Sequence, residues 1–181
     1  MIVWNSPELV IDALNGNAGE VMQHFYSKFP PKTMWLGTGT ALGLYRDKDF
    51  CKGDTDIDFI TFGSPNTDKS YEQYLIGSLY DYKLVRTTYD KDLIQQLCFM
   101  KDGVLVDVYY FYDDGNRYTN HSESGWSFMP KPIFDDRKEL STKYGTYYFP
   151  HPIEMYLAIT YGTDWKVPMA SKPNYSQKRT K

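Results

Sequence analysis

The sequence has few cysteines, no excess of basic charge and no long apolar segment, and each shortage excludes a class of protein. Its two cysteines, Cys51 and Cys98, are far apart and lack the spacing of a zinc site or a disulfide framework. Lys and Arg number 20 against 23 Asp and Glu, so the chain as a whole lacks the basic surface typical of DNA-binding proteins. No apolar run approaches the ~20 residues of a membrane-spanning helix, and the N-terminus has no signal-peptide core. These features predict a soluble cytoplasmic protein with no membrane span and no DNA partner.

Aromatic side chains, in contrast, are abundant and make up 17% of the 181 residues. Together with a hydrophobic fraction of 41%, they are sufficient for one packed core. We predict a single domain over residues 1–171 and a disordered basic tail over residues 172–181.

Apolar spacing and turn residues predict helices followed by a mixed sheet, and therefore an α+β fold built from helix and sheet layers. A hairpin turn is expected at Lys101–Gly103, because Asp-Gly favours the positive φ values of a tight turn. The polar stretch Asp113–Ser124 is interpreted as a loop. The expected helices cover residues 6–16, the stretch containing Val21, Phe25 and Phe29, residues 71–79 and residues 152–161. The expected strands cover residues 33–37, 55–62, 82–89, 93–100, 104–112, 126–129 and 146–149.

Three aspartates lie where strands would bring carboxylates together. Asp56 and Asp58 alternate with Ile57 and Phe59, so in a strand both carboxylates lie on one face and the apolar side chains on the other. Carboxylates this close repel each other unless a cation lies between them, and Mg²⁺ prefers such hard oxygen ligands. The alternative is an edge strand whose acidic face is solvated. Asp107 favours the metal site, because it lies in an otherwise apolar strand where an acid needs a partner. A third acid is also typical of two-metal phosphoryl-transfer sites.

A segment rich in glycine and threonine precedes the acids and has the composition of a phosphate-binding turn. Gly39 and Thr40 lie at the start of an expected helix near Ala41, where backbone N–H groups and the helix N-terminus attract anions. Arg46 adds a planar donor suited to phosphate. The segment is neither a Walker loop nor a dinucleotide fingerprint. The turn formed by residues 37–43, together with Arg46, is therefore a candidate phosphate-binding segment.

The order of these residues resembles that of a known family. Residues 39–46 read Gly-Thr-Ala-Leu-Gly-Leu-Tyr-Arg, Phe50 follows, and residues 54–58 read Asp-Thr-Asp-Ile-Asp. This pattern is similar to that of the LicD/fukutin phosphotransferases, a family within the polymerase-β-like nucleotidyltransferase superfamily. Residues 103–111 and 150–168 resemble the family's strand with the third acid and its closing element, so the resemblance extends over residues 34–168.

The resemblance implies a nucleotidyltransferase-like fold, in which helices flank a mixed β-sheet and a small helical element follows at the C-terminal end. It also implies transfer of a phosphorylated alcohol, such as phosphocholine or ribitol phosphate, from a CDP-linked donor to a glycan hydroxyl. Asp56 and Asp58 would then hold Mg²⁺, or alternatively Mn²⁺, against the donor diphosphate. Asp107 would complete a second metal site or accept the proton of the acceptor, and Gly39, Thr40 and Arg46 would hold the donor phosphates. The resemblance leaves open whether Asp54 and His151 take part.

Two other functions fit the same residues. A nucleotidyltransferase that moves a nucleoside monophosphate from an NTP to a small molecule, a protein or RNA would use the same three acids with a different donor. A non-catalytic relative that only binds its ligand is the third possibility, and the retention of all three acids disfavours it. The sequence gives neither the transferred group nor the acceptor.

Overall fold

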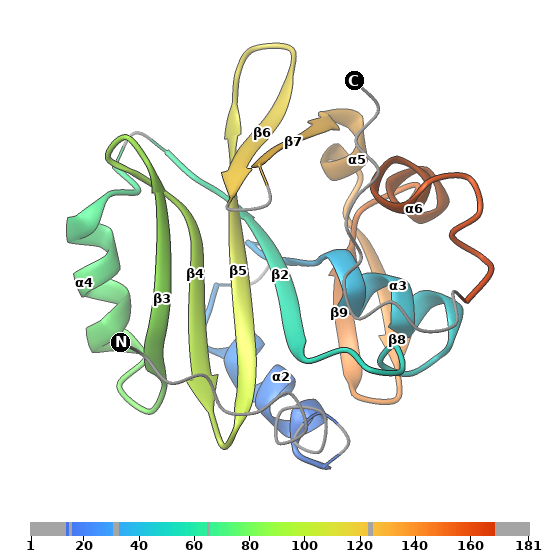
Figure 1. The fold of residues 1–181 in the computed structure, drawn as a ribbon, viewed down its shortest axis with the longest axis horizontal. Coiled ribbons are helices and arrows are strands. Elements are labelled where there is room, and N and C mark those ends of the chain that lie inside the picture. The colour runs from blue at the N-terminus through green and yellow to red at the C-terminus, as the bar shows by residue number, and fades with distance from the viewer. Residues whose placement is uncertain (1–13, 15, 31–32, 65, 123–124, 169–181) are drawn as a thin grey trace.

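The chain has a mixed α+β architecture, as the sequence predicts (Figure 1). The computed structural model describes residues 14, 16–30, 33–64, 66–122 and 125–168. Most of the helix expected over residues 6–16 and the whole tail 172–181 lie outside the described residues. The helices are α2 (Ala18–Ser27), α3 (Thr38–Arg46), α4 (Lys69–Ser78), α5 (Pro132–Asp135) and α6 (Ile153–Tyr161). The strands are β1 (Trp35–Leu36), β2 (Asp56–Phe62), β3 (Lys83–Asp90), β4 (Leu93–Lys101), β5 (Val104–Asp113), β6 (Arg117–Ser122), β7 (Gly125–Pro130), β8 (Lys138–Thr142) and β9 (Gly145–Phe149).

A seven-stranded mixed sheet forms the centre of the fold. Its main path has the order β1-β2-β5-β4-β3, and β6 and β7 extend it from the end of β5. β2 and β5 run parallel, whereas the other neighbouring pairs are antiparallel. The register places Asp58 opposite Asp107 and Phe59 opposite Val108, so two strands distant in sequence carry matching acidic and apolar positions.

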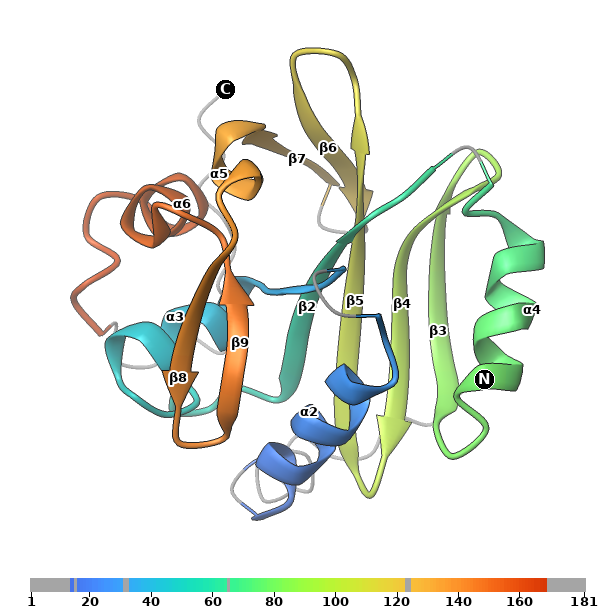
Figure 2. The ribbon, with the colours of Figure 1, turned by 180° about the vertical axis from the view of Figure 1, so that it is seen from behind.

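The two faces of the sheet differ in character. Ile57 and Phe59 of β2 and Val106 and Val108 of β5 are buried on one face. Helix α2 lies across this face (Figure 2), and its Phe25 ring stacks on Phe59. Burying each such side chain contributes about 1.5–3 kcal/mol. A shift of one residue would move this apolar set to the other face, so burial fixes the register that presents the acids opposite α2.

A second group of elements lies on the β1–β2 side of the sheet. Figures 1 and 2 both show α3, α6 and the β8–β9 hairpin gathered there. Leu42 and Leu44 of α3 and Leu157 of α6 are buried in the common core. This packing fixes the N-terminal end of α3 beside β2. Among the described residues, no helix is both long and apolar enough to cross a membrane.

The structure confirms one turn prediction and overturns one loop prediction. The hairpin at Lys101–Gly103 is present, with positive φ at Asp102 (52°) and Gly103 (81°). The interpretation of Asp113–Ser124 as a loop is wrong, because Arg117–Ser122 forms strand β6. Polar composition concealed this strand: Asn120 is only 2% exposed, and its Nδ2 donates to the backbone carbonyls of residues 95 and 110. Strand β8, also polar, was not expected either.

Candidate metal centre

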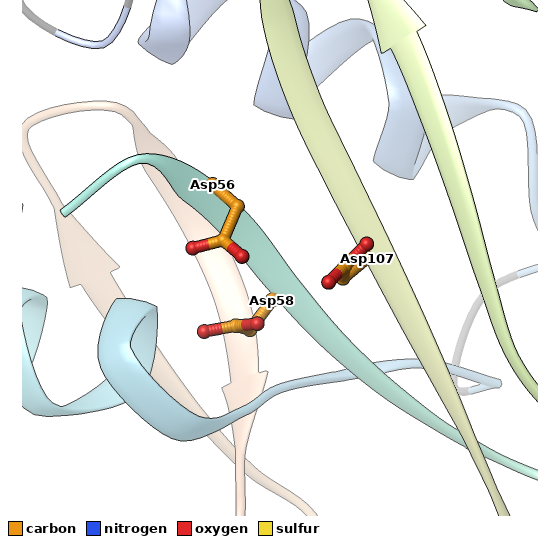
Figure 3. A group of neighbouring side chains, drawn as sticks. All are labelled: Asp56, Asp58 and Asp107. Carbon is orange, nitrogen blue, oxygen red and sulfur yellow. The ribbon is translucent and has the colours of Figure 1, made fainter. Parts of the chain in front are cut away.

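Three aspartates from two neighbouring strands form a compact acidic group. Asp56 and Asp58 lie on β2 and Asp107 on β5, and each offers an oxygen within 4.8 Å of those of the other two (Figure 3). Asp58 is 5% exposed and Asp107 is 2% exposed. The expectation that the strand carrying Asp107 lies beside the strand carrying the first two acids is confirmed, and the parallel register is what brings them together. We call Asp56, Asp58 and Asp107 the acidic triad.

Burial and mutual repulsion disfavour the charged forms of these acids. Burial is the main reason that the pKa of Asp56 is raised to about 8, and the negative charges of Asp107 and Asp54 add to it. The pKa of Asp58 is raised well above its usual value, first by burial and then by the charge of Asp56. Neighbouring Asp54 has a pKa raised to about 6, again chiefly by burial. Without a cation the group is therefore most stable when it holds protons.

The donor set fits a small divalent cation. Three carboxylates supply hard oxygen ligands, which Mg²⁺ and Mn²⁺ prefer. Softer metals instead prefer thiolate or imidazole ligands. Mg²⁺ uses few protein carboxylates and keeps positions for water and phosphate oxygens. A dication in contact with the acidic triad would also relieve the repulsion that raises the pKa of Asp56 and Asp58. Acidic groups are common on protein surfaces, but this one is largely buried, and burial makes its charge costly unless it is neutralised.

The start of α3 is joined to β2 at Asp58. The backbone N–H of Gly39 donates to Oδ2 of Asp58 at 3.0 Å, and the N–H of Asp58 donates to Oγ1 of Thr40 at 2.9 Å. Thr40 is completely buried, so in this structure it supports the acidic strand. A Cβ added to Gly39 would lie 2.7 Å from Oδ2 of Asp54, so a side chain at this position would displace that carboxylate. A direct contact of Gly39 or Thr40 with phosphate stays a prediction.

The residue before Gly39 is held in a strained conformation. Thr38 has φ of 32°, a left-handed value that is unfavourable for a β-branched residue and costs about 1–3 kcal/mol. Its N–H donates to the hydroxyl of Tyr156 on α6 at 2.8 Å. The C-terminal element therefore helps to hold the turn that leads into the site. Nothing in the sequence indicated this strain, because the residue type is not one that favours positive φ.

Arg46, predicted to bind phosphate, lies at the other end of α3. Its Nε and Nη2 donate to the carboxylate of Asp47, both at 2.7 Å, and its Nη1 donates to the carbonyl of Trp165 at 3.0 Å. The guanidinium therefore links α3 to the segment after α6. Contact of Arg46 with a substrate stays a prediction.

Sequence reasoning missed the polar side chains of β3 and β4 that contact the acidic triad. Arg86 of β3 lies 3.2 Å from Oδ2 of Asp107, and Gln96 of β4 donates to the same oxygen at 2.6 Å. The available signal was weak: each is a polar residue in a strand-forming segment. His151, which the sequence left open, pairs with Asp136 at 3.5 Å and is not part of the acidic triad.

Comparisons of the chain with models of known protein families and with curated proteins gave no match. The functional interpretation therefore rests on the residues and the geometry of this site.

Proposed function

We propose that this chain is a divalent-metal-dependent phosphotransferase of the LicD/fukutin type with a nucleotidyltransferase-like fold. The observation that carries the proposal is the acidic triad, in which two buried carboxylates and one half-buried carboxylate from adjacent parallel strands offer oxygens within 4.8 Å of one another. Buried acids of this kind destabilise a fold unless they are neutralised, so a functional reason for their presence is needed. Binding of a dication together with a diphosphate supplies that reason.

The proposed substrates are a CDP-linked alcohol as donor and a glycan hydroxyl as acceptor. In the transfer, the acceptor oxygen forms a bond to the phosphorus of the transferred group, and the bond from that phosphorus to the CMP oxygen breaks. The acceptor's proton passes to water. When bound, Mg²⁺ or Mn²⁺ would neutralise charge on the phosphate oxygens.

Each residue of the site has a role in this proposal. Asp56 and Asp58 would hold the metal that binds the donor diphosphate, and Asp107 would complete the site on the acceptor side. Gly39 and Thr40 support Asp58 through the two hydrogen bonds between α3 and β2, and the N-terminal end of α3 would face the donor phosphates. Arg46 would contribute to donor binding from the far end of α3.

A thermal-shift panel tests the proposal. CDP-choline, CDP-ribitol, NDP-sugars and NTPs would each be titrated in Mg²⁺ and in EDTA. A donor at 100 times its Kd stabilises by about 2.7 kcal/mol, which corresponds to a rise in Tm of roughly 5–10 °C for a chain of this size. We expect this rise with a CDP-alcohol, only in Mg²⁺, and not in the Asp58→Asn variant.

The same panel distinguishes the alternatives. Stabilisation by NTPs alone, with release of pyrophosphate, would favour a nucleotidyltransferase. Binding of a CDP-alcohol without release of CMP in the presence of hydroxyl acceptors would favour a non-catalytic binding protein. Stabilisation that is the same in Mg²⁺ and EDTA would contradict the metal-dependent site.

A further inference from the structure

Two side chains donate hydrogen bonds to the same carboxylate oxygen of Asp107. Nη2 of Arg86 and Nε2 of Gln96 both approach Oδ2, at 3.2 Å and 2.6 Å. Gln96 is 4% exposed and Asp107 is 2% exposed, so this contact lies where little water can replace it. A hydrogen bond to a buried carboxylate is stronger and more directional than one at the surface.

The register of the sheet explains how Arg86 reaches the acid. Arg86 pairs with Cys98, Cys98 with Asp107, and Asp107 with Asp58, so the four residues form one row across β3, β4, β5 and β2. A register shift in β3 separates Leu84 from Arg86. Strict alternation would place these two residues on the same face, but Leu84 pairs with the buried Phe99 whereas Arg86 pairs with Cys98. The irregularity thus turns Arg86 toward the acidic face, as β-bulges next to active sites often do.

The two oxygens of Asp107 have different surroundings. Figure 3 shows one of them directed toward Asp56 and Asp58 and the other directed away. The donors come from β3 and β4, which lie on the far side of β5 from β2. The engaged oxygen is therefore the one directed away from the other acids.

We propose that Arg86 and Gln96 are positioning residues, which hold Asp107 so that it binds the metal through one oxygen only. The inference rests on the proposed function, because it concerns the same metal centre. Two donors on one oxygen fix the rotation of the carboxylate and oppose a change to two-oxygen binding. Residues that hydrogen-bond to a metal's carboxylate ligands typically contribute 10–100-fold to metal affinity. We expect Gln96 and Arg86 to contribute within this range.

The neighbouring Gln95 provides a matched control. It has the same side chain on the same strand and is also 4% exposed. Its Oε1 accepts the N–H of His121 on β6 at 2.8 Å, so replacement also removes a buried hydrogen bond, but away from Asp107. The experiment compares Mn²⁺ binding by isothermal titration calorimetry in the full-length wild-type, Gln96→Leu and Gln95→Leu proteins, with Tm measured for each.

Gln96→Leu should weaken Mn²⁺ binding by about 10–100-fold. Gln95→Leu should leave Mn²⁺ binding unchanged, although its Tm should fall by a similar amount. Equal Mn²⁺ affinity in wild type and Gln96→Leu would overturn the positioning role, as would an equal loss of affinity in both variants. If the wild-type protein itself binds no Mn²⁺, the proposed metal centre is wrong and the inference falls with it.

Arg86→Lys carries the test if Gln96→Leu does not fold, because lysine keeps the positive charge beside the metal centre but loses the guanidinium donor. Its control is Arg117→Lys, at an arginine–aspartate ion pair of the same length, 3.2 Å, at the exposed start of β6. Weaker Mn²⁺ binding is expected in Arg86→Lys alone. Unchanged binding in Arg86→Lys would overturn the assignment.

Discussion

Replacing Asp56 with asparagine tests how costly the acidic triad is without a metal. The folded-state pKa of Asp56 is raised to about 8 from an ordinary value of 3.8, chiefly by burial. The folded protein therefore binds a proton more tightly than the unfolded chain does. Between these two pKa values the unfolded chain has released the proton while the folded protein retains it. The free energy of unfolding must therefore fall as pH rises through this window.

The size of the effect follows from the number of protons. One retained proton changes the free energy of unfolding by up to about 1.4 kcal/mol per pH unit. From pH 5 to pH 7 in EDTA, the wild-type protein should therefore lose up to about 3 kcal/mol because of one such acid. Asp56→Asn removes one acid from the coupled group, so its slope should be smaller by about one proton. At pH 7 without metal the variant should be the more stable protein.

Urea unfolding at pH 5, 6 and 7 in EDTA measures these slopes. Asp113→Asn is a suitable control, because Asp113 is exposed and its hydrogen bond with Lys131 lowers its pKa. That substitution should give no gain in stability at pH 7. If the wild-type protein becomes more stable from pH 5 to 7, or if Asp56→Asn keeps the wild-type slope, the electrostatic description of the site is wrong.

Three further substitutions give distinct expected results. Asp107→Ala should abolish transfer but leave donor binding in Mg²⁺ largely intact, because Asp56 and Asp58 still hold the donor's metal. Thermal shift measures donor binding, and its loss would contradict this division of roles. Arg46→Lys should lower stability by about 1 kcal/mol in urea unfolding, because lysine cannot reproduce the paired donors that Asp47 accepts, and donor affinity should fall as well. Unchanged donor affinity would leave Arg46 with a structural role only. Gly39→Ala should weaken Mn²⁺ binding measured by calorimetry, because its Cβ would lie 2.7 Å from Oδ2 of Asp54, and a shift of the turn to relieve this contact would disturb the hydrogen bond from Gly39 to Asp58.

The sequence was sufficient to predict the parts of the site that depend on local pattern. Alternation of acid and apolar residues placed Asp56 and Asp58 on one face, and the apolar neighbours of Asp107 indicated a buried strand. The glycine and threonine residues before them predicted the start of a helix, which is α3. These predictions succeeded because the alternation of side chains along a strand and the residues that begin a helix can both be recognised within a few consecutive residues.

The parts that the sequence did not reveal depend on contacts between distant strands. Arg86 and Gln96 reach Asp107 because β3 and β4 follow β5 in the sheet, and no local pattern encodes that order. The register shift before Arg86 also reverses the face that alternation would assign to it. Strand β6 was missed because its buried Asn120 is satisfied by carbonyls of other strands, a partnership that only the tertiary structure supplies.

Anomalous diffraction from crystals soaked in Mn²⁺ would test the metal centre most directly. We expect an anomalous peak among the carboxylates of Asp56, Asp58 and Asp107, with metal–oxygen distances of about 2.0–2.3 Å. The peak should be absent in crystals of Asp58→Asn. A wild-type crystal that binds Mn²⁺ elsewhere, or not at all, while the three carboxylates keep their positions would contradict the central claim that they form a metal site.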